Sequence, residues 1–283
     1  MYPLVLTFHK IIPDQYVNHP YYWKSLCTPY STFLCFIESL YQENFAFISL
    51  QELEYAKISP SERTVLLTFD DGYYNNIEYA YPLLKSENIP FVMAINGRCI
   101  ENNTWQWFDK VWYYGIQQGK TEQERIQMIE KFKYDIFALE QWLNTQAIPQ
   151  NYSEIEHIFF GIANVQELKK LQNVSFVSHT YSHYILTALP ESILHNEITQ
   201  NILFAQKNHI NLHHNYFVLP NGTLKDFNLR TIEVLKKNQV KGIFTMLPYT
   251  KLDDLIPRYT PVQNTWQKER KRYLWRRFLY KWK

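Results

Sequence analysis

The chain has 283 residues, of which 46% are hydrophobic and 17% aromatic, a composition that excludes a disordered or collagen-like protein. The formal net charge of +2 is unevenly distributed: residues 268–283 hold eight Lys/Arg and one Glu, or +7, and the other 21 basic and 26 acidic residues sum to −5. Cys27, Cys35 and Cys99 are odd in number and form no CxxC pair, so we expect reduced core cysteines rather than a disulfide framework.

Short apolar runs rich in β-branched and aromatic residues alternate with segments of helical period. Strands are predicted at residues 3–9, 46–50, 64–70, 91–96, 174–178, 216–219, 242–246 and 255–260, and helices at 31–44, 75–88, 165–172, 190–208 and 226–238. This alternation is typical of an α/β protein in which crossover helices join strands into a mostly parallel sheet or barrel.

The alternation breaks between residues 98 and 166. Three tryptophans lie there, together with two predicted helices near 108–118 and 122–143. We expect this stretch to be a helical insertion or a lid within a single domain that spans residues 1–267.

Two polar segments directly follow predicted strands, where α/β barrels gather their working residues. Asp70 ends the strand predicted at 64–70, and Asp71 and Gly72 follow it; adjacent carboxylates are costly there unless a cation or a proton relieves them. The alternative is an Asx-type turn or a helix cap. His179 and His183 follow the strand at 174–178, and two imidazoles at this spacing can face one cation together.

The motifs Thr-Phe-Asp-Asp-Gly at 68–72 and His-Thr-Tyr-Ser-His at 179–183 together resemble those of the polysaccharide deacetylases, the NodB-homology type of carbohydrate esterase family four. The resemblance covers most of the chain up to Pro261, with residues 98–166 outside the common core. In motif pattern it is closest to the poly-N-acetylglucosamine deacetylase branch. It implies an irregular (β/α) barrel of about seven strands with a helical insertion.

The implied activity is the metal-dependent removal of N-acetyl groups from amino sugars of a surface polysaccharide or its precursor. By resemblance, Asp71, His179 and His183 would hold one divalent ion, expected to be Zn²⁺. Asp70 would be the general base, and the backbone N–H of Tyr73 would help to bind the oxyanion.

The segment at 216–222 resembles the family's Arg-x-Pro-x-Gly element, in which the proline and glycine, here Pro220 and Gly222, shape the wall of the site. Val218 stands where the arginine would be, as in the poly-N-acetylglucosamine branch. Arg258, at another predicted strand end, is the candidate to orient the catalytic aspartate in its place. The alternative is an ordinary surface arginine.

Many members of the family take their general acid from a late Leu-x-His element, but no histidine follows His214 here. His9, at the end of the first predicted strand, resembles a histidine of the poly-N-acetylglucosamine branch and is expected to protonate the leaving amine. The alternative is a histidine bonded to backbone. Tyr181 is a candidate to stack on a sugar ring, although core or lid packing is the more common role in so aromatic a chain.

The tail at 268–283 is predicted to form a helix with an aromatic face opposite a basic one. Such a helix suits an anionic membrane surface, and docking on the barrel suits it equally. Nucleic-acid binding would need a wider basic surface than the rest of the chain offers, because residues 1–267 have a net charge of −5. Without a signal peptide or a stretch of about 18 apolar residues, the chain is expected to be cytoplasmic, with peripheral contact at the inner membrane as the further option.

Two other functions stay open. One is a deacylase or deformylase of the same mechanism that acts on a small or nucleotide-linked amino sugar. The other is a non-catalytic glycan-binding module that keeps only the barrel. The presence of Asp70, Asp71, His179 and His183 together favours an enzyme.

Overall fold

The structure is a computed structural model that describes residues 3–55, 63–146, 152–247 and 254–261. The strands are β1 (Leu4–Phe8), β2 (Lys10–Ile12), β3 (Cys27–Pro29), β4 (Ala46–Phe47), β5 (Thr64–Phe69), β6 (Phe91–Ile95), β7 (Val174–Ser178), β8 (Leu212–Val218), β9 (Gly242–Thr245) and β10 (Leu255–Pro257). The α-helices are α1 (Tyr30–Gln42), α2 (Leu50–Tyr55), α3 (Tyr81–Ser86), α4 (Gly97–Glu101), α5 (Trp107–Gln117), α6 (Glu122–Lys133), α7 (Ile136–Thr145), α8 (Glu154–Phe160), α9 (Val165–Lys169), α10 (Glu191–Lys207) and α11 (Leu229–Lys237). Short 3₁₀ or π-helical turns lie at Asp14–Tyr16, Asn76–Ala80 and Leu186–Ala188.

The main sheet follows one path, β1-β5-β6-β7-β8-β9-β10, with every pair parallel and β4 beside β5. Just beyond β10, the backbone N–H of Tyr259 donates to Val5, and its carbonyl accepts a hydrogen bond from Thr7. These bonds bring the last strand back to the first. The predicted (β/α) barrel of about seven strands is therefore confirmed.

Strand residues separate into an inner and an outer apolar cluster, because successive side chains of a strand point to opposite faces. Val5, Leu66 and Val177 belong to the inner cluster, together with Leu50 and Leu53 of α2. Their chain neighbours on the strands belong to the larger outer cluster, which the surrounding helices share. Burial on both faces explains the nearly continuous hydrophobic run of β5.

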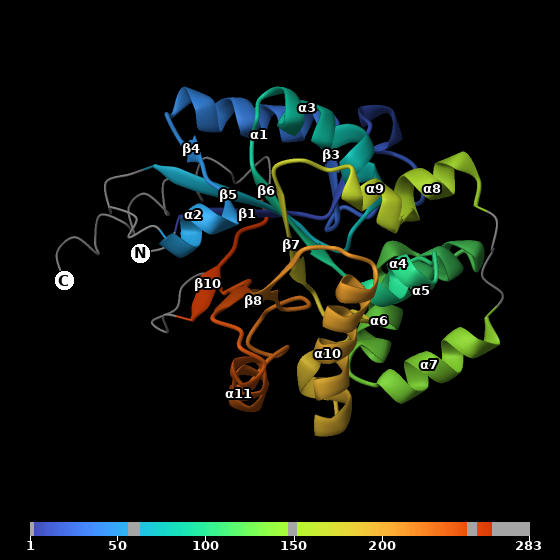
Figure 1. Ribbon diagram of the computed structural model, residues 1–283. Helices are drawn as coiled ribbons and strands as arrows, with labels where there is room; N and C mark the ends of the chain where they lie inside the picture. Colours follow the sequence, from blue (N-terminus) through green and yellow to red (C-terminus); the bar gives the residue numbers. More distant parts are fainter. Residues whose placement is uncertain (1–2, 56–62, 147–151, 248–253, 262–283) are drawn as a thin grey trace.

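The helices surround this sheet (Figure 1). Helices α1 and α3 lie on one side of it, and α10 and α11 lie on the opposite side. Helices α4 to α9 gather at a third side, and they contain most of the described residues of the stretch from 98 to 166 that the sequence marks as irregular. Their position leaves α5 and α6 near the carboxyl ends of the strands, where the site lies.

The structure corrects three details of the sequence prediction. The helix predicted at 122–143 is two helices, because the Asp135 side chain accepts a hydrogen bond from Ala138 N–H and starts α7 anew. The strand predicted at 46–50 ends at Phe47, because Ser49 and Glu52 form a capping box that starts α2. Cys35 is exposed rather than in the core, whereas the other two cysteines are buried.

Two further predictions concern the chain beyond the barrel. The helix predicted at 268–283 lies outside the described residues. Among the residues that the structure does describe, none of the helices combines the length and the apolar character needed to cross a bilayer.

Candidate active site

The predicted site residues come together at the carboxyl end of the barrel. His9, Asp70, His179 and Arg258 each continue the inward-facing series of their strands, two or four residues beyond a member of the inner cluster. The two-residue period of a β-strand therefore turns all four side chains toward the barrel axis. Asp70, His179 and Arg258 are almost completely buried, and His9 is partly exposed.

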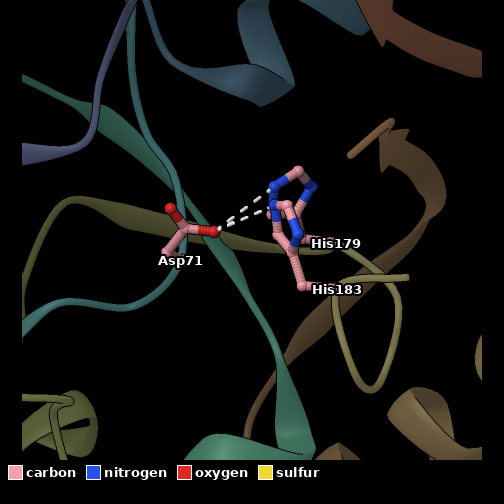
Figure 2. A group of neighbouring side chains, drawn as sticks. All are labelled: Asp71, His179 and His183. Carbon is pink, nitrogen blue, oxygen red and sulfur yellow. Dashed lines mark ion pairs between the residues drawn. The ribbon is translucent and has the colours of Figure 1, made fainter. Parts of the chain in front are cut away.

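Asp71, His179 and His183 form a compact buried cluster (Figure 2). Oδ1 of Asp71 lies 3.3 Å from Nε2 of His183 and 3.6 Å from Nε2 of His179, and the three potential ligand atoms all lie within 4.8 Å of one another. Within the described part of the chain, neither carboxylate oxygen of Asp71 accepts a hydrogen bond, although both are buried.

Unpaired buried charge is costly, and a divalent cation would relieve it. Burial and the neighbouring carboxylates of Asp70 and Asp109 raise the pKa of Asp71 well above its usual value. Burial also lowers the pKa values of His179 and His183, which keeps both imidazoles neutral, the form that binds metals. One carboxylate and two neutral imidazoles form a donor set that suits Zn²⁺ and leaves a position open. The residues present thus fit a divalent metal.

The backbone around this cluster is unusual. Asp71, Thr180 and His183 have φ angles of 72°, 63° and 58°, in the left-handed region that non-glycine residues rarely occupy. Gly72, with φ of 69°, continues the turn after Asp71 without a steric penalty. Non-glycine residues in this region cost free energy and concentrate at functional sites, so this clustering agrees with a working role for the two loops.

Arg258 fixes the orientation of Asp70. Its Nη1 donates to Oδ1 of Asp70 at 2.7 Å, to Oγ1 of Thr7 at 3.0 Å and to Oγ1 of Thr68 at 3.3 Å. Burial alone would raise the pKa of Asp70, but Arg258 and the nearby His179 outweigh it and hold that pKa well below its usual value. Asp70 is therefore a carboxylate at neutral pH, and its Oδ2 is left facing the site.

Val218 occupies the position in which the family motif would place an arginine, and its backbone has a different task. Its carbonyl oxygen lies 2.9 Å from Nδ1 of His179, which sets that ring to present Nε2 to Asp71. Two residues beyond, Pro220 and Gly222 form a tight turn in which Gly222 has φ of 72°. A Cβ at Gly222 would lie 2.9 Å from the backbone N of Met246, so the close approach of β9 requires glycine there.

His9 lies on the other side of Asp70. Its Nε2 is 3.9 Å from Oδ2 of Asp70, and its side chain is 21% exposed and lines the cavity. Burial, opposed by Asp70, lowers the pKa of His9 to about 4, so the imidazole is neutral at pH 7. His9 thus lies next to Asp70 and lines the same cavity.

A cavity of about 320 Å³ is lined by His9, Asp70, Asp71, His183 and Arg258. Asn221 also lines it, whereas its two chain neighbours, Pro220 and Gly222, are not among the lining residues. The cavity is of the size of a small ligand pocket.

Tyr73 and Tyr181, the remaining predicted residues, are not among those that line the cavity. The hydroxyl of Tyr181 donates to Glu101 at 2.7 Å. Tyr73 is buried and lies opposite Ile162 in an isolated β-bridge. The two hydrogen bonds of this bridge run from Ala163 N–H to the Gly72 carbonyl and from Tyr74 N–H to the Gly161 carbonyl. The bridge thus leaves the backbone N–H of Tyr73 out of this pairing.

Several residues that the sequence did not single out position the loops that carry Asp71 and His179. Nε2 of Gln106 donates to the backbone carbonyl of Asp71 at 3.1 Å and to Oδ1 of Asn96 at 3.0 Å. Nδ2 of Asn96 in turn donates to the backbone carbonyls of His179 and Thr180. Two buried amides therefore tie the Asp71 loop to the His179 loop. Buried Asn or Gln side chains carry no recognisable spacing, so only the fold discloses them.

Helix α5 adds two contacts to the same loops. Nε1 of Trp107 donates to the carbonyl of His183 at 3.0 Å, and the Phe108 ring packs edge-to-face on His183 at 4.9 Å between centroids. Asp109 of the same helix makes a further, buried link to the barrel. Its Oδ1 lies 2.6 Å from Nζ of Lys10, and its Oδ2 accepts a hydrogen bond from the Tyr73 hydroxyl at 2.6 Å. The irregular stretch from 98 to 166 is thus anchored directly to the site.

Known structures share this fold. IcaB from Ammonifex degensii aligns over 94% of both chains with a TM-score of 0.62 and 17% identity. A de-N-acetylase from Aggregatibacter actinomycetemcomitans aligns over 95% of this chain and 98% of its own, with the same TM-score and 17% identity. The Streptococcus pyogenes deacetylase PplD, solved in complex with acetate, aligns over 96% and 97% with a TM-score of 0.62 and 15% identity.

At such identities these structures establish the fold alone, and the family assignment depends on sequence. No curated protein sequence matches this chain significantly. The sequence profile of polysaccharide deacetylases, in contrast, matches residues 57–243. This span contains Asp70 and Asp71, His179 and His183, and most of the barrel. Because that match extends over well more than half of the sequence, the chain belongs to the polysaccharide deacetylase family.

Proposed function

We propose that the protein is a metal-dependent hydrolase that removes N-acetyl groups from amino sugars of a surface polysaccharide or its precursor. One observation carries the proposal: the buried Asp71, which accepts no hydrogen bond from the described residues, faces two histidines beside an ionised Asp70 that Arg258 holds in place. Membership of the deacetylase family supports this reading of the geometry.

Asp71, His179 and His183 would hold the ion. A bound Zn²⁺ would polarise the amide carbonyl and lower the pKa of water at the site. Asp70 is the base: Arg258 occupies its Oδ1, so Oδ2 is the atom that removes a proton from the attacking water. The backbone N–H of Tyr73 is the proposed donor to the oxyanion.

The proton balance involves His9. Addition of water to the carbonyl and cleavage of the C–N bond release acetate and an amine, and the amine nitrogen needs a proton. Because the pKa of His9 is about 4, the ring is neutral at pH 7 and must first gain that proton. The proton taken from water would pass from Oδ2 of Asp70 to Nε2 of His9, now 3.9 Å apart, once substrate binding brings the two atoms within hydrogen-bond distance.

Two of the structural neighbours agree with this chemistry by name. One is described as a de-N-acetylase, and another was solved in complex with acetate, the product that the proposed reaction releases.

The test is acetate release from free and lipid-linked N-acetylhexosamine oligosaccharides, with added Zn²⁺ and with a chelator. We expect release that the chelator abolishes and that Zn²⁺ restores. Formate release from N-formyl sugars without acetate release would assign the deformylase alternative. Binding of glycans without release of either acid, in protein shown to contain metal, would favour the glycan-binding module and refute the enzyme.

We also propose that residues 268–283 hold the protein at an anionic membrane surface, at the inner face of the cytoplasmic membrane. The support is the sequence: eight basic residues interleaved with tryptophan and tyrosine. Co-sedimentation with vesicles containing phosphatidylglycerol, but not with neutral vesicles, is expected. The paired reversal Arg276→Glu and Arg277→Glu in the full chain should weaken it, because each basic residue near such a surface contributes about 1 kcal/mol. Equal sedimentation of both proteins would contradict the proposal.

A further inference from the structure

The cavity extends well beyond the catalytic groups, onto the stretch between residues 98 and 166. Helix α5 lines it with Trp107 and Phe108, and helix α6 lines it with Ile129, Glu130 and Lys133. An acetyl group alone does not need a cavity of about 320 Å³, which is a volume in the range of pockets for whole small ligands. The outer part therefore has room for more of the substrate than the bond that is cleaved.

The wall formed by α6 is a fixed part of the fold. The hydroxyl of Tyr134, directly after α6, donates to Oδ1 of Asp226 at 3.0 Å. Oδ2 of Asp226 accepts the backbone N–H of Thr223 at 2.9 Å and also its hydroxyl. Thr223 and Asn221 line the same cavity. The buried Asp226 thus joins α6 to the loop after β8, and the two walls keep one spacing.

Lys133 is available to a ligand. Its Nζ lies 3.2 Å from Glu130 and 3.9 Å from Asp226, and its side chain is 15% exposed. Asp226 is already satisfied by Tyr134 and Thr223, so it does not require the ammonium group. Lys133 has three N–H donors, and Glu130, with a side chain 54% exposed, has free acceptor capacity.

The charges around this wall select the kind of ligand. A phosphate or carboxylate beside Lys133 would also lie beside the carboxylates of Glu130 and Asp226, which would repel it. A neutral group with hydroxyls can accept from Lys133 and donate to Glu130 at the same time. The apolar surfaces of Trp107 and Ile129 complete a site with one apolar and one polar side, which matches the faces of a pyranose ring.

We propose that Ile129, Glu130 and Lys133 of α6 form a subsite for an uncharged pyranose unit that adjoins the N-acetylated sugar. The proposal rests on the proposed function and extends it: the substrate is an oligosaccharide without phosphate at that unit, and the 98–166 stretch supplies its specificity.

The test compares Glu130→Gln and Lys133→Met with Lys131→Met, a matched control because Lys131 is exposed on the same helix and does not line the cavity. Binding is measured in the full chain carrying Asp70→Asn, through the fluorescence of the cavity tryptophans, with β-1,4- and β-1,6-linked N-acetylglucosamine trimers and the monosaccharide. We expect about tenfold weaker trimer binding for the two wall variants, the loss of one charge-assisted hydrogen bond, and less than about twofold change for the control. Zinc binding and affinity for the monosaccharide should stay within about twofold.

Trimer affinities equal to the control in both wall variants would overturn the subsite, as would the absence of trimer binding in the parent protein. Tighter binding of a phosphorylated trimer than of the neutral one would overturn the assignment of an uncharged unit. If circular dichroism shows that the Lys133→Met protein is unfolded, Glu130→Gln and Lys133→Arg are compared with the control instead. Because binding is measured without turnover, the two proposals can fail separately. Weakened trimer binding in the wall variants, together with no acetate release from the unsubstituted chain with Asp70 intact, would refute the proposed function and leave the subsite standing.

Discussion

The neighbouring carboxyls of Asp70 and Asp71 are identical in chemistry and opposite in environment. Arg258 pairs with Asp70, and the pKa of that carboxyl falls. Asp71 lies among histidines that burial keeps neutral, and its pKa rises when no cation is near. Two carboxyls whose surroundings separate their pKa values divide two tasks between them. Asp70 suits the removal of a proton and Asp71 suits the binding of a cation.

Replacing Asp70 by Asn should lower kcat on the order of a hundredfold or more and leave zinc content unchanged, because the amide cannot accept the proton of water. Acetate release and metal analysis of the same protein sample check this. Asp71→Asn is the paired variant and should lose the metal. Full activity in the Asp70→Asn protein would refute the assignment of the base.

Acid stability should depend on His9. Its pKa is about 4 in the folded chain and 6.5 in a free histidine, so between these values the unfolded state binds more protons. Stability therefore rises with pH in this window and is lost as pH falls through it. In metal-free protein, His9→Gln should reduce the loss of unfolding free energy from pH 7 to pH 5 by up to about 2 kcal/mol. Urea unfolding at both pH values measures it, and an unchanged loss would contradict the placement of His9.

At the scale of elements, helix α5 connects the irregular stretch to the barrel. Asp109 on α5 reaches Lys10 on β2 and the hydroxyl of Tyr73 after β5, and Nζ of Lys10 also lies 4.5 Å from the centre of the Tyr73 ring. All three residues are buried. Burial raises the pKa of Asp109, and Lys10 opposes that rise. A buried ion pair of this kind is costly to break on one side only.

Asp109→Asn should destabilise the fold by about 3–5 kcal/mol, since it leaves the Lys10 ammonium buried without a carboxylate. The double replacement Lys10→Met with Asp109→Leu should cost less, because no charge is left unpaired. Lys207→Met is the control: it removes an exposed ion pair with Glu101 and should change stability by less than about 1 kcal/mol. Urea denaturation ranks the three, and a double variant no more stable than Asp109→Asn would contradict this account.

At the scale of the whole molecule, closure of the barrel assembles the site. Asp71 follows β5, both histidines follow β7, and Arg258 follows β10 and lies 188 positions from Asp70 in the chain. The unfolded chain keeps these groups apart. A metal bound by Asp71, His179 and His183 therefore binds the folded state far more tightly than the unfolded state.

Zinc should accordingly raise the melting temperature. At free zinc of about one hundred times the dissociation constant, the stabilisation is about 2.7 kcal/mol. Differential scanning calorimetry with and without a chelator checks this, with Asp71→Asn as the control that should show no shift. An equal shift in that control would place the metal elsewhere.

The elements that the sequence predicts best are those with a strong local signal. The buried runs of β5 and β7 and the helical periods of α1 and α10 lie where expected, because burial of one or both faces selects the residue types. Helix α2 was missed although its signal is present in Ser49 and Glu52, three residues apart. This helix start is therefore encoded locally, in a capping box that overlaps the end of the apolar run.

The motifs and the strand period alone identify the family resemblance, the barrel and the convergence of Asp70, Asp71, His179 and His183 at the strand ends, because each of these depends on short-range spacing. Only the tertiary structure decides that Arg258 pairs with Asp70, that Gln106 and Asn96 join the two ligand loops, and that α6 walls the cavity. The Arg258–Asp70 and Gln106–Asp71 contacts join residues 188 and 35 positions apart. They form only when the barrel closes and α5 packs on it, and no local pattern encodes that.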